Sequence, residues 1–221
     1  MHWERTPVGV DPGIVDRSGR MASRQNQRGV VMRSLSVILL AACSVAACSD
    51  SEPADEWITL FDGGDLDAFN AVGNANWTIE EETVRADEGE GFLVTGETFD
   101  DFELEAEFWA DVPANSGIFV RCPDPRDIAA ETCYEVNIFD ARPDQTYRTG
   151  SIVDVASSAA FVHAAERWNT FRIAADGTRL TVELNGIALV DTEDDRLSGG
   201  YIGLQRAAGT IAFRSVRIRP R

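Results

Sequence analysis

The chain has 221 residues and a formal net charge of −17, and every one of its 20 basic residues is arginine. Such an acidic chain is a poor binder of nucleic acid, because contacts with phosphate need a basic face. The absence of lysine excludes Schiff-base catalysis and a P-loop lysine. An apolar content of 44% is too high for a disordered chain, so we expect one folded domain and a short additional segment.

The N-terminal part has the pattern of a leader that is removed. Residues 1–31 are polar and rich in arginine, and their simplest interpretation is a non-native upstream extension, with translation starting at Met32. Residues 32–47 combine a basic start, a short apolar core and small residues, which is typical of a secretory signal peptide and too short to span a bilayer. Cys43 and Cys48 both follow small residues, as lipoprotein processing requires. We favour Cys48, because processing at Cys43 leaves a very short apolar core.

This pattern predicts a lipoprotein of the bacterial cell envelope that faces the periplasm or the outside. Lipid on Cys48 would anchor it to the membrane, and several acyl chains on one cysteine bind far better than a single myristoyl group. Residues 48–56 then form an acidic tether, and residues 57–221 form the domain.

From Trp57 onward the pattern is that of β-strands. In residues 102–108 apolar side chains alternate with glutamates, and alternation continues in residues 117–121 and 134–139. Between the latter two runs, Cys122 and Cys133 bracket a loop rich in Pro and Asp. In an oxidising periplasm this pair predicts a disulfide, which should stabilise the fold by roughly 2–3 kcal/mol. A zinc site would need more Cys and His than the mature chain offers.

The remaining strands follow the same rule. Alternating or apolar runs occupy residues 168–173, 180–184, 187–190, 201–204 and 211–218. Asp176-Gly177 and Asn185-Gly186 are signals for tight hairpin turns. About a dozen short strands joined by such turns predict an all-β fold, a two-sheet antiparallel β-sandwich of the concanavalin-like or laminin-G-like jelly-roll type.

The outward-facing side chains of two of these strands are unusually rich in functional groups. They are Asn115, Gly117, Phe119 and Arg121 on one strand, and Glu135, Asn137 and Phe139 on the next. If the disulfide closes a hairpin between the strands, Arg121 and Glu135 lie close together on one face, beside two aromatic rings. Rings that stack on sugars, with polar groups that bind hydroxyls, predict a carbohydrate site. The alternative is a solvated sheet face with one cross-strand ion pair.

Eight stretches of the domain follow a known family pattern in order. They are ITLFDGGDLDAF (58–69), NSGIFVR (115–121), YEVNIFD (134–140), TGSIVDV (149–155), RWNTFRI (167–173), LNG (184–186), GYIGLQ (200–205) and IAFRSVRI (211–218). With these stretches the chain resembles the 3-keto-disaccharide hydrolase family, formerly a domain of unknown function with a concanavalin-like jelly roll. The family commonly has Gln at the position of Asn137 and often Tyr at that of Val153, and the loop between the two cysteines is not general in it.

The resemblance implies action on glycosides whose C3 hydroxyl has been oxidised to a ketone. The ketone acidifies the C2 proton, so a base can remove it and expel the C1 substituent, and water then adds back. This chemistry needs a base near C2 and a donor for the enolate oxygen. On the shared motif positions we expect Glu135 to be the base and Arg121 the enolate clamp, with Asp140 supporting them. The substrate-binding candidates are Asn115, Phe119, Asn137, Phe139, Asp154 and His163.

Three other groups of residues have alternative interpretations. One strand face carries three glutamates, Glu103, Glu105 and Glu107. A retaining glycosidase needs two carboxylates about 5–5.5 Å apart, and neighbouring members of this row could supply them. A solvated acidic face explains the row as well. His163 is either a general acid or a solvated loop residue. Calcium could bind the aspartates of residues 62–67 or 191–195, although turns explain both runs and we predict no other cofactor or metal site.

The sequence therefore predicts a secreted lipoprotein hydrolase or lyase that cleaves 3-keto-disaccharides and related glycosides, with no nucleic-acid partner. A non-catalytic carbohydrate-binding module of laminin-G type would use the same face without turnover. An acidic structural lipoprotein would bind no sugar at all.

Overall fold

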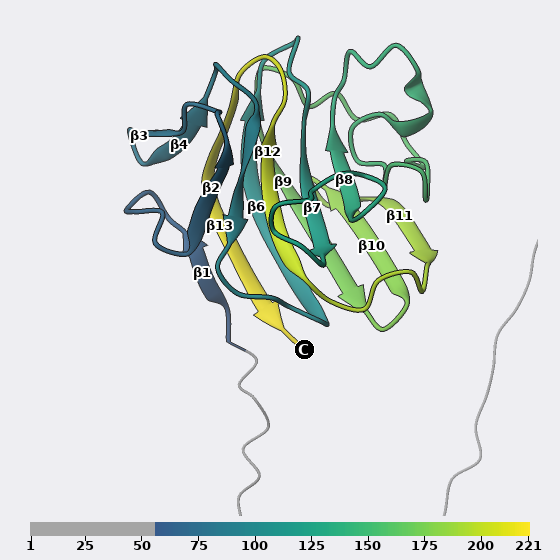
Figure 1. Cartoon of the computed structure of the whole chain (residues 1–221). Coiled ribbons are helices and arrows are strands. Elements are labelled where there is room, and N and C mark those ends of the chain that lie inside the picture. Colours follow the sequence, from purple (N-terminus) through teal and green to yellow (C-terminus); the bar gives the residue numbers. More distant parts are fainter. Residues whose placement is uncertain (1–55) are drawn as a thin grey trace, which may run out of the picture. The chain divides into compact units, whose positions relative to one another are not determined.

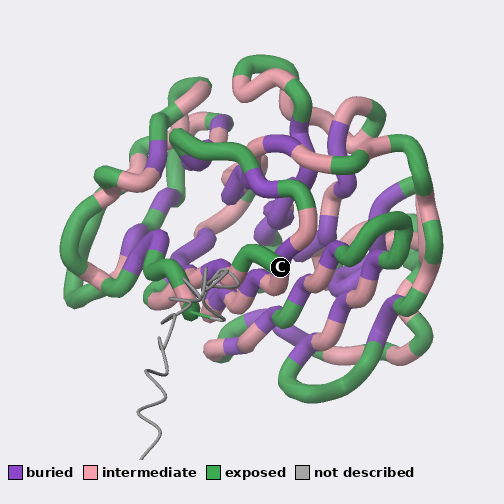
Figure 2. Tube along the Cα trace, turned by 90° about the horizontal axis from the view of Figure 1, so that it is seen from below, coloured by how far each residue is buried: buried purple, intermediate pink, exposed green. Residues whose placement is uncertain are grey.

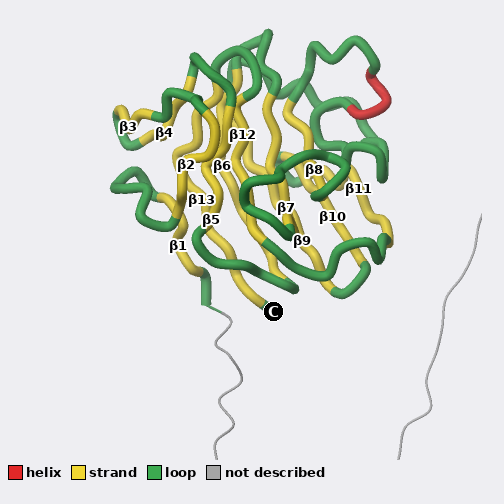
Figure 3. Tube along the Cα trace, viewed as in Figure 1, coloured by secondary structure: helices red, strands yellow, loops and turns green. Residues whose placement is uncertain are grey.

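The structure is a computed structural model that describes residues 56–221. The expected upstream extension, the signal peptide, the lipidation site Cys48 and all but the last residue of the tether lie outside the described residues. The described chain forms strands β1 to β13 and a single turn of 3₁₀-helix, η1 (Gln145–Tyr147), in the loop that follows β8 (Figures 1 and 3). Within this part of the chain, no helix has the length and apolar character that crossing a membrane requires.

The strands form two antiparallel sheets that pack face to face. Sheet A contains, in spatial order, β11 (Ile187–Glu193), β10 (Arg179–Leu184), β9 (Trp168–Asp176), β6 (Phe102–Ala110), β13 (Ile211–Pro220), β4 (Thr83–Ala86) and β3 (Thr78–Glu80), and β1 (Ile58–Phe61) also pairs with β13. Sheet B contains β2 (Phe69–Gly73), β5 (Gly91–Thr95), β12 (Tyr201–Arg206), β7 (Ser116–Cys122) and β8 (Tyr134–Ile138). This arrangement confirms the predicted β-sandwich of jelly-roll type.

Alternation along the strands supplies the core between the sheets. In β6 the residues from Phe102 to Ala110 are alternately buried and half-buried, as the sequence predicts. Phe108 of this strand stacks on Phe171 of β9 with ring centroids 4.9 Å apart. Full burial of each such side chain stabilises the fold by roughly 1.5–3 kcal/mol. Figure 2 shows the buried residues along the strands and most exposed residues in the connecting loops.

The predicted hairpins also form. Asp176 ends β9, Gly177 has a φ of +54°, and β10 returns beside β9. Asn185 and Gly186 have φ values of +54° and +77° and connect β10 with β11. Asn and Gly tolerate this left-handed region better than other residues do, so they allow the tight turn between twisted strands.

The glutamates on the outer face of β6 are bound by arginines. Glu105 lies 3.0 Å from Arg172 Nε and 2.5 Å from Arg217 Nη2, and Glu107 pairs with Arg214. Burial raises the pKa of Glu103, but its hydrogen bonds with Arg219 of β13 and with Arg221 at the C-terminus outweigh the effect of burial. The pKa of Glu103 is therefore below its usual range. A glycosidase acid needs a raised pKa. The carboxylates therefore form an ion-pair ladder and do not have the character of the retaining-glycosidase pair.

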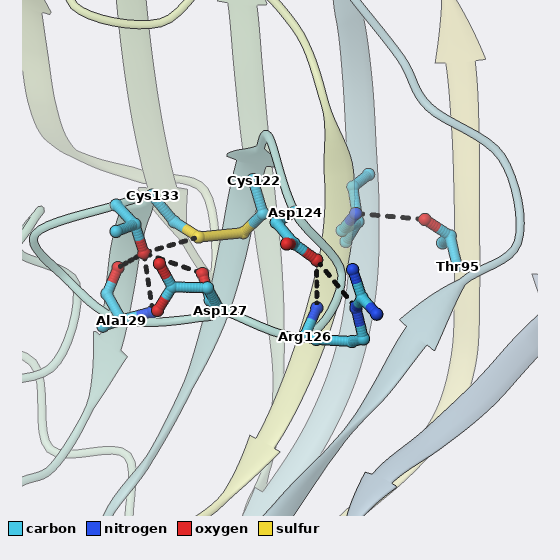
Figure 4. Close-up of a disulfide and its surroundings, with 9 residues drawn as sticks. Thr95, Cys122, Asp124, Arg126, Asp127, Ala129 and Cys133 are labelled. Carbon is cyan, nitrogen blue, oxygen red and sulfur yellow. Dashed lines mark hydrogen bonds and ion pairs between the residues drawn. A yellow bond between two sulfur atoms is a disulfide. The ribbon is translucent and has the colours of Figure 1, made fainter.

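Cys122 and Cys133 form the predicted disulfide at the end of the β7–β8 hairpin, with Cα atoms 4.6 Å apart (Figure 4). In the loop between them, the Thr132 hydroxyl accepts a hydrogen bond from the Ala129 amide and donates one to the Asp127 carbonyl. The disulfide therefore holds a loop that is itself ordered by short-range hydrogen bonds.

This loop covers part of the outer face of sheet B. A Cβ atom on Gly203 of β12 would lie 3.3 Å from Ile128 Cδ1, so the absence of a side chain on Gly203 lets the loop approach the strand closely. Ile128 packs with Phe92 and Tyr201 around Phe119 and the disulfide. Phe119 is buried beneath this loop, whereas Ile118 and Val120 are buried in the core between the sheets. All seven residues of β7 are therefore buried, and the expectation of an open sugar-binding face on this strand is wrong.

Candidate functional site

Glu135 lies on the outer face of sheet B. In the β7–β8 ladder it is opposite Phe119, and Asn137 is opposite Gly117. The neighbouring residues Tyr134 and Val136 point into the core, so the alternation of β8 directs Glu135 outward. The side chain is half-buried between the strands and the loops that flank them.

The Glu135 carboxylate occupies the space that Gly117 leaves. A Cβ atom on Gly117 would lie 3.3 Å from Glu135 Oε1 and 3.3 Å from a ring carbon of Phe119. The carboxylate forms no hydrogen bond or ion pair with any residue in the described part of the chain. A half-buried carboxylate without a partner is free to accept a proton from a ligand.

The surroundings make Glu135 a base suited to neutral pH. Burial raises its pKa from 4.5 to about 7, because the ionised form loses hydration. The positive charge of Arg142 lowers this pKa, whereas the negative charges of Glu131 and Asp154 raise it. A base with a pKa near the working pH is both ionised and able to hold a proton.

Arg142 is the basic residue whose charge lowers the pKa of Glu135. It lies in the loop between β8 and η1, where its backbone amide donates to the Phe139 carbonyl. Among the described residues its guanidinium has no hydrogen-bond or ion-pair partner. It can therefore offer donors to a negatively charged oxygen that develops near Glu135.

Two buried amide oxygens beside Gly117 also lack a donor. Asn137 donates its side-chain amide to the Tyr147 carbonyl, which leaves Asn137 Oδ1 buried and unpaired. Leu204 pairs with Ile118, which places Gln205 on the outer face beside Gly117, and Gln205 Oε1 is likewise unpaired. Unpaired buried acceptors are uncommon, and together these oxygens make the floor beside Glu135 strongly polar.

Gln205 was not among the residues expected from the sequence. The stretch GYIGLQ contains the necessary signal, since Gln205 follows the buried Leu204 and must point to the opposite face. Sequence analysis did not identify Gln205, because the sequence of a strand does not show which other strands pair with it.

Arg121 does not face Glu135, and its expected role as enolate clamp is wrong. Its φ is +54°, and the pairing of β12 with β7 shifts register next to it. This bulge turns the side chain away from the outer row, and Arg121 is 0% exposed. Its guanidinium donates to Asp101 Oδ1 at 2.8 Å and to three backbone carbonyls, so it fastens loops beneath the sheet.

The other residues expected to bind substrate lie in different environments. Phe119 is 1% exposed and meets Phe92 edge-to-face at 5.3 Å, so it offers no ring for stacking on a sugar. Phe139 is half-buried at the end of β8. Asn115 precedes β7, where its backbone pairs with Ala208. Asp154 is exposed with a φ of +60° and acts on Glu135 through its charge.

Asp140 organises loops through four hydrogen bonds. It accepts from the Thr149 hydroxyl at 2.5 Å, from the backbone amides of Ala164 and Ala165, and from His163 Nδ1 at 2.8 Å. His163 is thereby oriented with its other nitrogen toward solvent, and its side chain is 51% exposed. No hydrogen bond or ion pair in residues 56–221 links this pair with Glu135, so Asp140 positions His163 and the loops and does not act on Glu135 directly.

Three of the possible cation ligands are used for other contacts. Asp65 accepts from the Asp67 amide in a turn, Asp191 pairs with Arg179, and Asp194 accepts from the Tyr134 hydroxyl. Within the described chain, no three His, Cys, Asp or Glu side chains converge on a point where they could hold a metal ion.

Comparisons with known proteins identify the family of the chain and agree with the fold. The model of the 3-keto-alpha-glucoside-1,2-lyase-like domain matches residues 56–219. A candidate glycosyl hydrolase from Parabacteroides distasonis is 24% identical, with a TM-score of 0.64 over 75% of this chain and 100% of that chain. A second candidate glycosyl hydrolase from this organism is 15% identical, with a TM-score of 0.67 over 75% of this chain and 94% of its own.

A binding module has the same architecture. The carbohydrate-binding module CBM66 from Bacillus subtilis is 17% identical, with a TM-score of 0.53 over 74% of this chain and 94% of the module. At these identities the solved structures establish the fold alone. No curated protein matches the chain.

Proposed function

The chain belongs to the 3-keto-alpha-glucoside-1,2-lyase-like domain family, and from this premise we propose that it cleaves 3-keto-glycosides, with Glu135 as the base. The observation that carries the proposal is the state of Glu135: half-buried, without a partner among the described residues, and with a pKa of about 7. The family match supports the class of substrate, and the geometry supports the residue.

The proposed reaction begins with removal of the C2 proton by the Glu135 carboxylate. The C2–H bond breaks, its electron pair forms an enolate with the C3 carbonyl, and Glu135 holds the proton. The C3 carbonyl then re-forms, a C1–C2 double bond is made and the C1–O bond breaks. The leaving oxygen takes the proton that Glu135 holds, so the C1 substituent departs as its alcohol and the carboxylate is regenerated. If water adds across this bond, the net result is hydrolysis; if it does not, the product is the unsaturated 3-keto sugar.

Arg142 replaces Arg121 as the proposed enolate clamp. Its charge acts on Glu135, and its guanidinium has no competing partner within the described residues. One well-placed donor of this kind contributes about 10²–10³ in rate. The unpaired oxygens of Asn137 and Gln205 are buried, so they contribute to the polarity around Glu135 and do not contact the sugar.

The cellular location is part of the same proposal. We propose that Cys48 carries lipid and holds the domain at the bacterial envelope, where small glycosides arrive by diffusion. The support is the leader pattern of residues 32–47. Replacing Cys48 with Ser should abolish incorporation of labelled fatty acid while leaving the domain folded.

A carbohydrate-binding module without turnover is the second candidate. The burial of Arg121 favours it, because the group expected to hold the enolate oxygen is absent from the reaction site. Incubation of residues 49–221 with 3-keto-trehalose distinguishes the two functions. Release of glucose by the wild-type protein, and its loss in Glu135→Gln, supports the lyase or hydrolase; equal release by both proteins removes Glu135 from the mechanism.

A further inference from the structure

A polar groove lies on the outer face of sheet A, on the opposite side of the core from Glu135. One row of side chains crosses four strands there, since Arg85 of β4 pairs with Ala212 of β13, Ala212 with Trp109 of β6, and Trp109 with Trp168 of β9. These strands lie next to one another in sheet A (Figure 1). Ala212 is much smaller than its neighbours, so the row is hollow between Arg85 and Trp109.

Two turns close the groove at one side. Glu81 and Glu82 connect β3 with β4 and have φ values of +49° and +60°. A Cβ atom on Gly63 would lie 2.7 Å from Glu82 Cβ, so the turn containing Asp62 and Gly63 packs closely against this hairpin. Asp62 and both glutamates line the groove, whose volume is about 550 Å³. This volume is in the range of small-molecule sites.

The far end of the groove has a fixed aromatic wall. The Arg214 guanidinium lies 4.4 Å from the centre of the Trp168 ring and also pairs with Glu107. Trp168 is therefore held in place by a cation, and Trp109, its register partner on β6, also lines the groove. An aromatic ring that does not move on binding loses little entropy when a ligand stacks on it.

The charges select against an anionic ligand. Arg85 is paired with Asp87 at 3.3 Å, and Arg214 is paired with Glu107, so both cations of the groove are already neutralised. The three carboxylates on the rim then leave an excess of negative charge. Carboxylates accept hydrogen bonds from hydroxyl groups, and indole rings pack on the apolar faces of sugar rings.

From this geometry we infer that the groove binds a neutral pyranose unit of a glycan chain, stacked on the indole wall of Trp109 and Trp168 and held through its hydroxyls by Asp62, Glu81 and Arg85. The domain thus has two sugar-directed faces: one with Glu135 on sheet B and one that retains a glycan on sheet A. The choice of glucose-based probes rests on the proposed function. The inference that the groove binds a sugar rests only on the residues that line the groove.

The test uses calorimetry of residues 49–221 with maltoheptaose and with cellohexaose. We expect saturable binding of at least one of them, and a loss of affinity of tenfold or more in Trp109→Ala. Ala212→Leu fills the hollow and leaves both indole rings in place, so it should also abolish binding. Loss of binding in this second variant would show that the result for Trp109→Ala does not come from a folding defect. Trp57→Ala is the matched control, because Trp57 lies under Arg217 and Arg219 outside the groove and its loss should leave the affinity unchanged.

Two results would overturn the inference: no saturable heat with either glucan at millimolar concentration, or binding that Trp109→Ala and Ala212→Leu leave intact. Turnover of 3-keto-trehalose is measured on the same variants. Trp109→Ala should keep turnover and Glu135→Gln should keep glucan binding, so failure of the groove and failure of the proposed function give different results.

Discussion

The Glu135 carboxylate lies over Gly117 of the adjacent strand, so close that a Cβ atom on Gly117 would be 3.3 Å from Glu135 Oε1 and 3.2 Å from Glu135 Cγ. The position of the base therefore depends on a residue that has no side chain. Phe119 and the loop held by the disulfide cover the same region, so the carboxylate is desolvated without being bound.

A methyl group at Gly117 should disturb this arrangement. In Gly117→Ala the Glu135 side chain must move by a few tenths of an ångström, and misplacement of a reacting group reduces its rate strongly. We expect kcat for 3-keto-trehalose to fall about tenfold or more, with KM and the melting temperature changed little. Unchanged kcat would show that the observed position of Glu135 does not matter. Gly96→Ala, at an exposed glycine without close neighbours, is the control.

The pH dependence of turnover should report the pKa of Glu135. The base works in its ionised form, so kcat/KM should rise with pH and level off above about 7. In Asp154→Asn one negative charge is lost and the midpoint should move to lower pH. In Arg142→Gln one positive charge is lost, so the midpoint should move to higher pH and kcat should fall about 100-fold. Shifts of the same sign in both variants would contradict this electrostatic account.

The same pKa should affect stability. The carboxyl of Glu135 binds its proton more tightly in the folded chain, with a pKa of about 7, than in the unfolded chain, with a pKa near 4.5. Between these values the folded state holds more protons, so the free energy of unfolding should decrease as pH rises from about 4.5 to about 7. The decrease is at most about 3 kcal/mol, and partial solvation reduces it. Urea unfolding of Glu135→Gln should lack this component; identical pH profiles would refute it.

Arg121 should matter for stability and not for chemistry. Removing its guanidinium in Arg121→Leu leaves the carbonyls of Asp100, Gly177 and Leu197 without this donor, and the Asp101 carboxylate keeps only the Gly177 amide. We expect a loss of about 3 kcal/mol or more in the free energy of unfolding, measured in urea. The folded fraction should keep the kcat of the wild type, and a selective loss of kcat would return Arg121 to the mechanism. Arg126→Ala, which removes an exposed arginine, should change the stability little.

Much of the fold could be predicted because the signals are local. The alternation from Phe102 to Phe108, the Asn185-Gly186 turn and the pairing of Cys122 with Cys133 each depend on residues close in the sequence, and the structure contains all three. The position of Glu135 on an outer face follows from the same rule.

The site itself was harder to predict, because it depends on contacts between distant segments. The alternation rule assumes a regular strand, and the positive φ of Arg121 breaks it at one residue. Strand periodicity also cannot show that Ile128 covers Phe119, since a loop folded over a sheet leaves no period in either segment. The position of Gln205 beside Gly117 depends on the pairing of β12 with β7, which joins segments far apart along the chain, so neither strand alone predicts it.

The central claim, that Glu135 removes the C2 proton, is tested most directly with a substrate analogue that has no leaving group. In 1,5-anhydro-3-keto-glucitol C1 carries no exocyclic leaving group, so removal of the C2 proton is followed by return of a deuteron from D₂O, and proton NMR follows this exchange by the loss of the C2 signal. We predict exchange by the wild type at a rate about 10²–10⁴ times that of Glu135→Gln. Equal exchange by the two folded proteins would contradict the account.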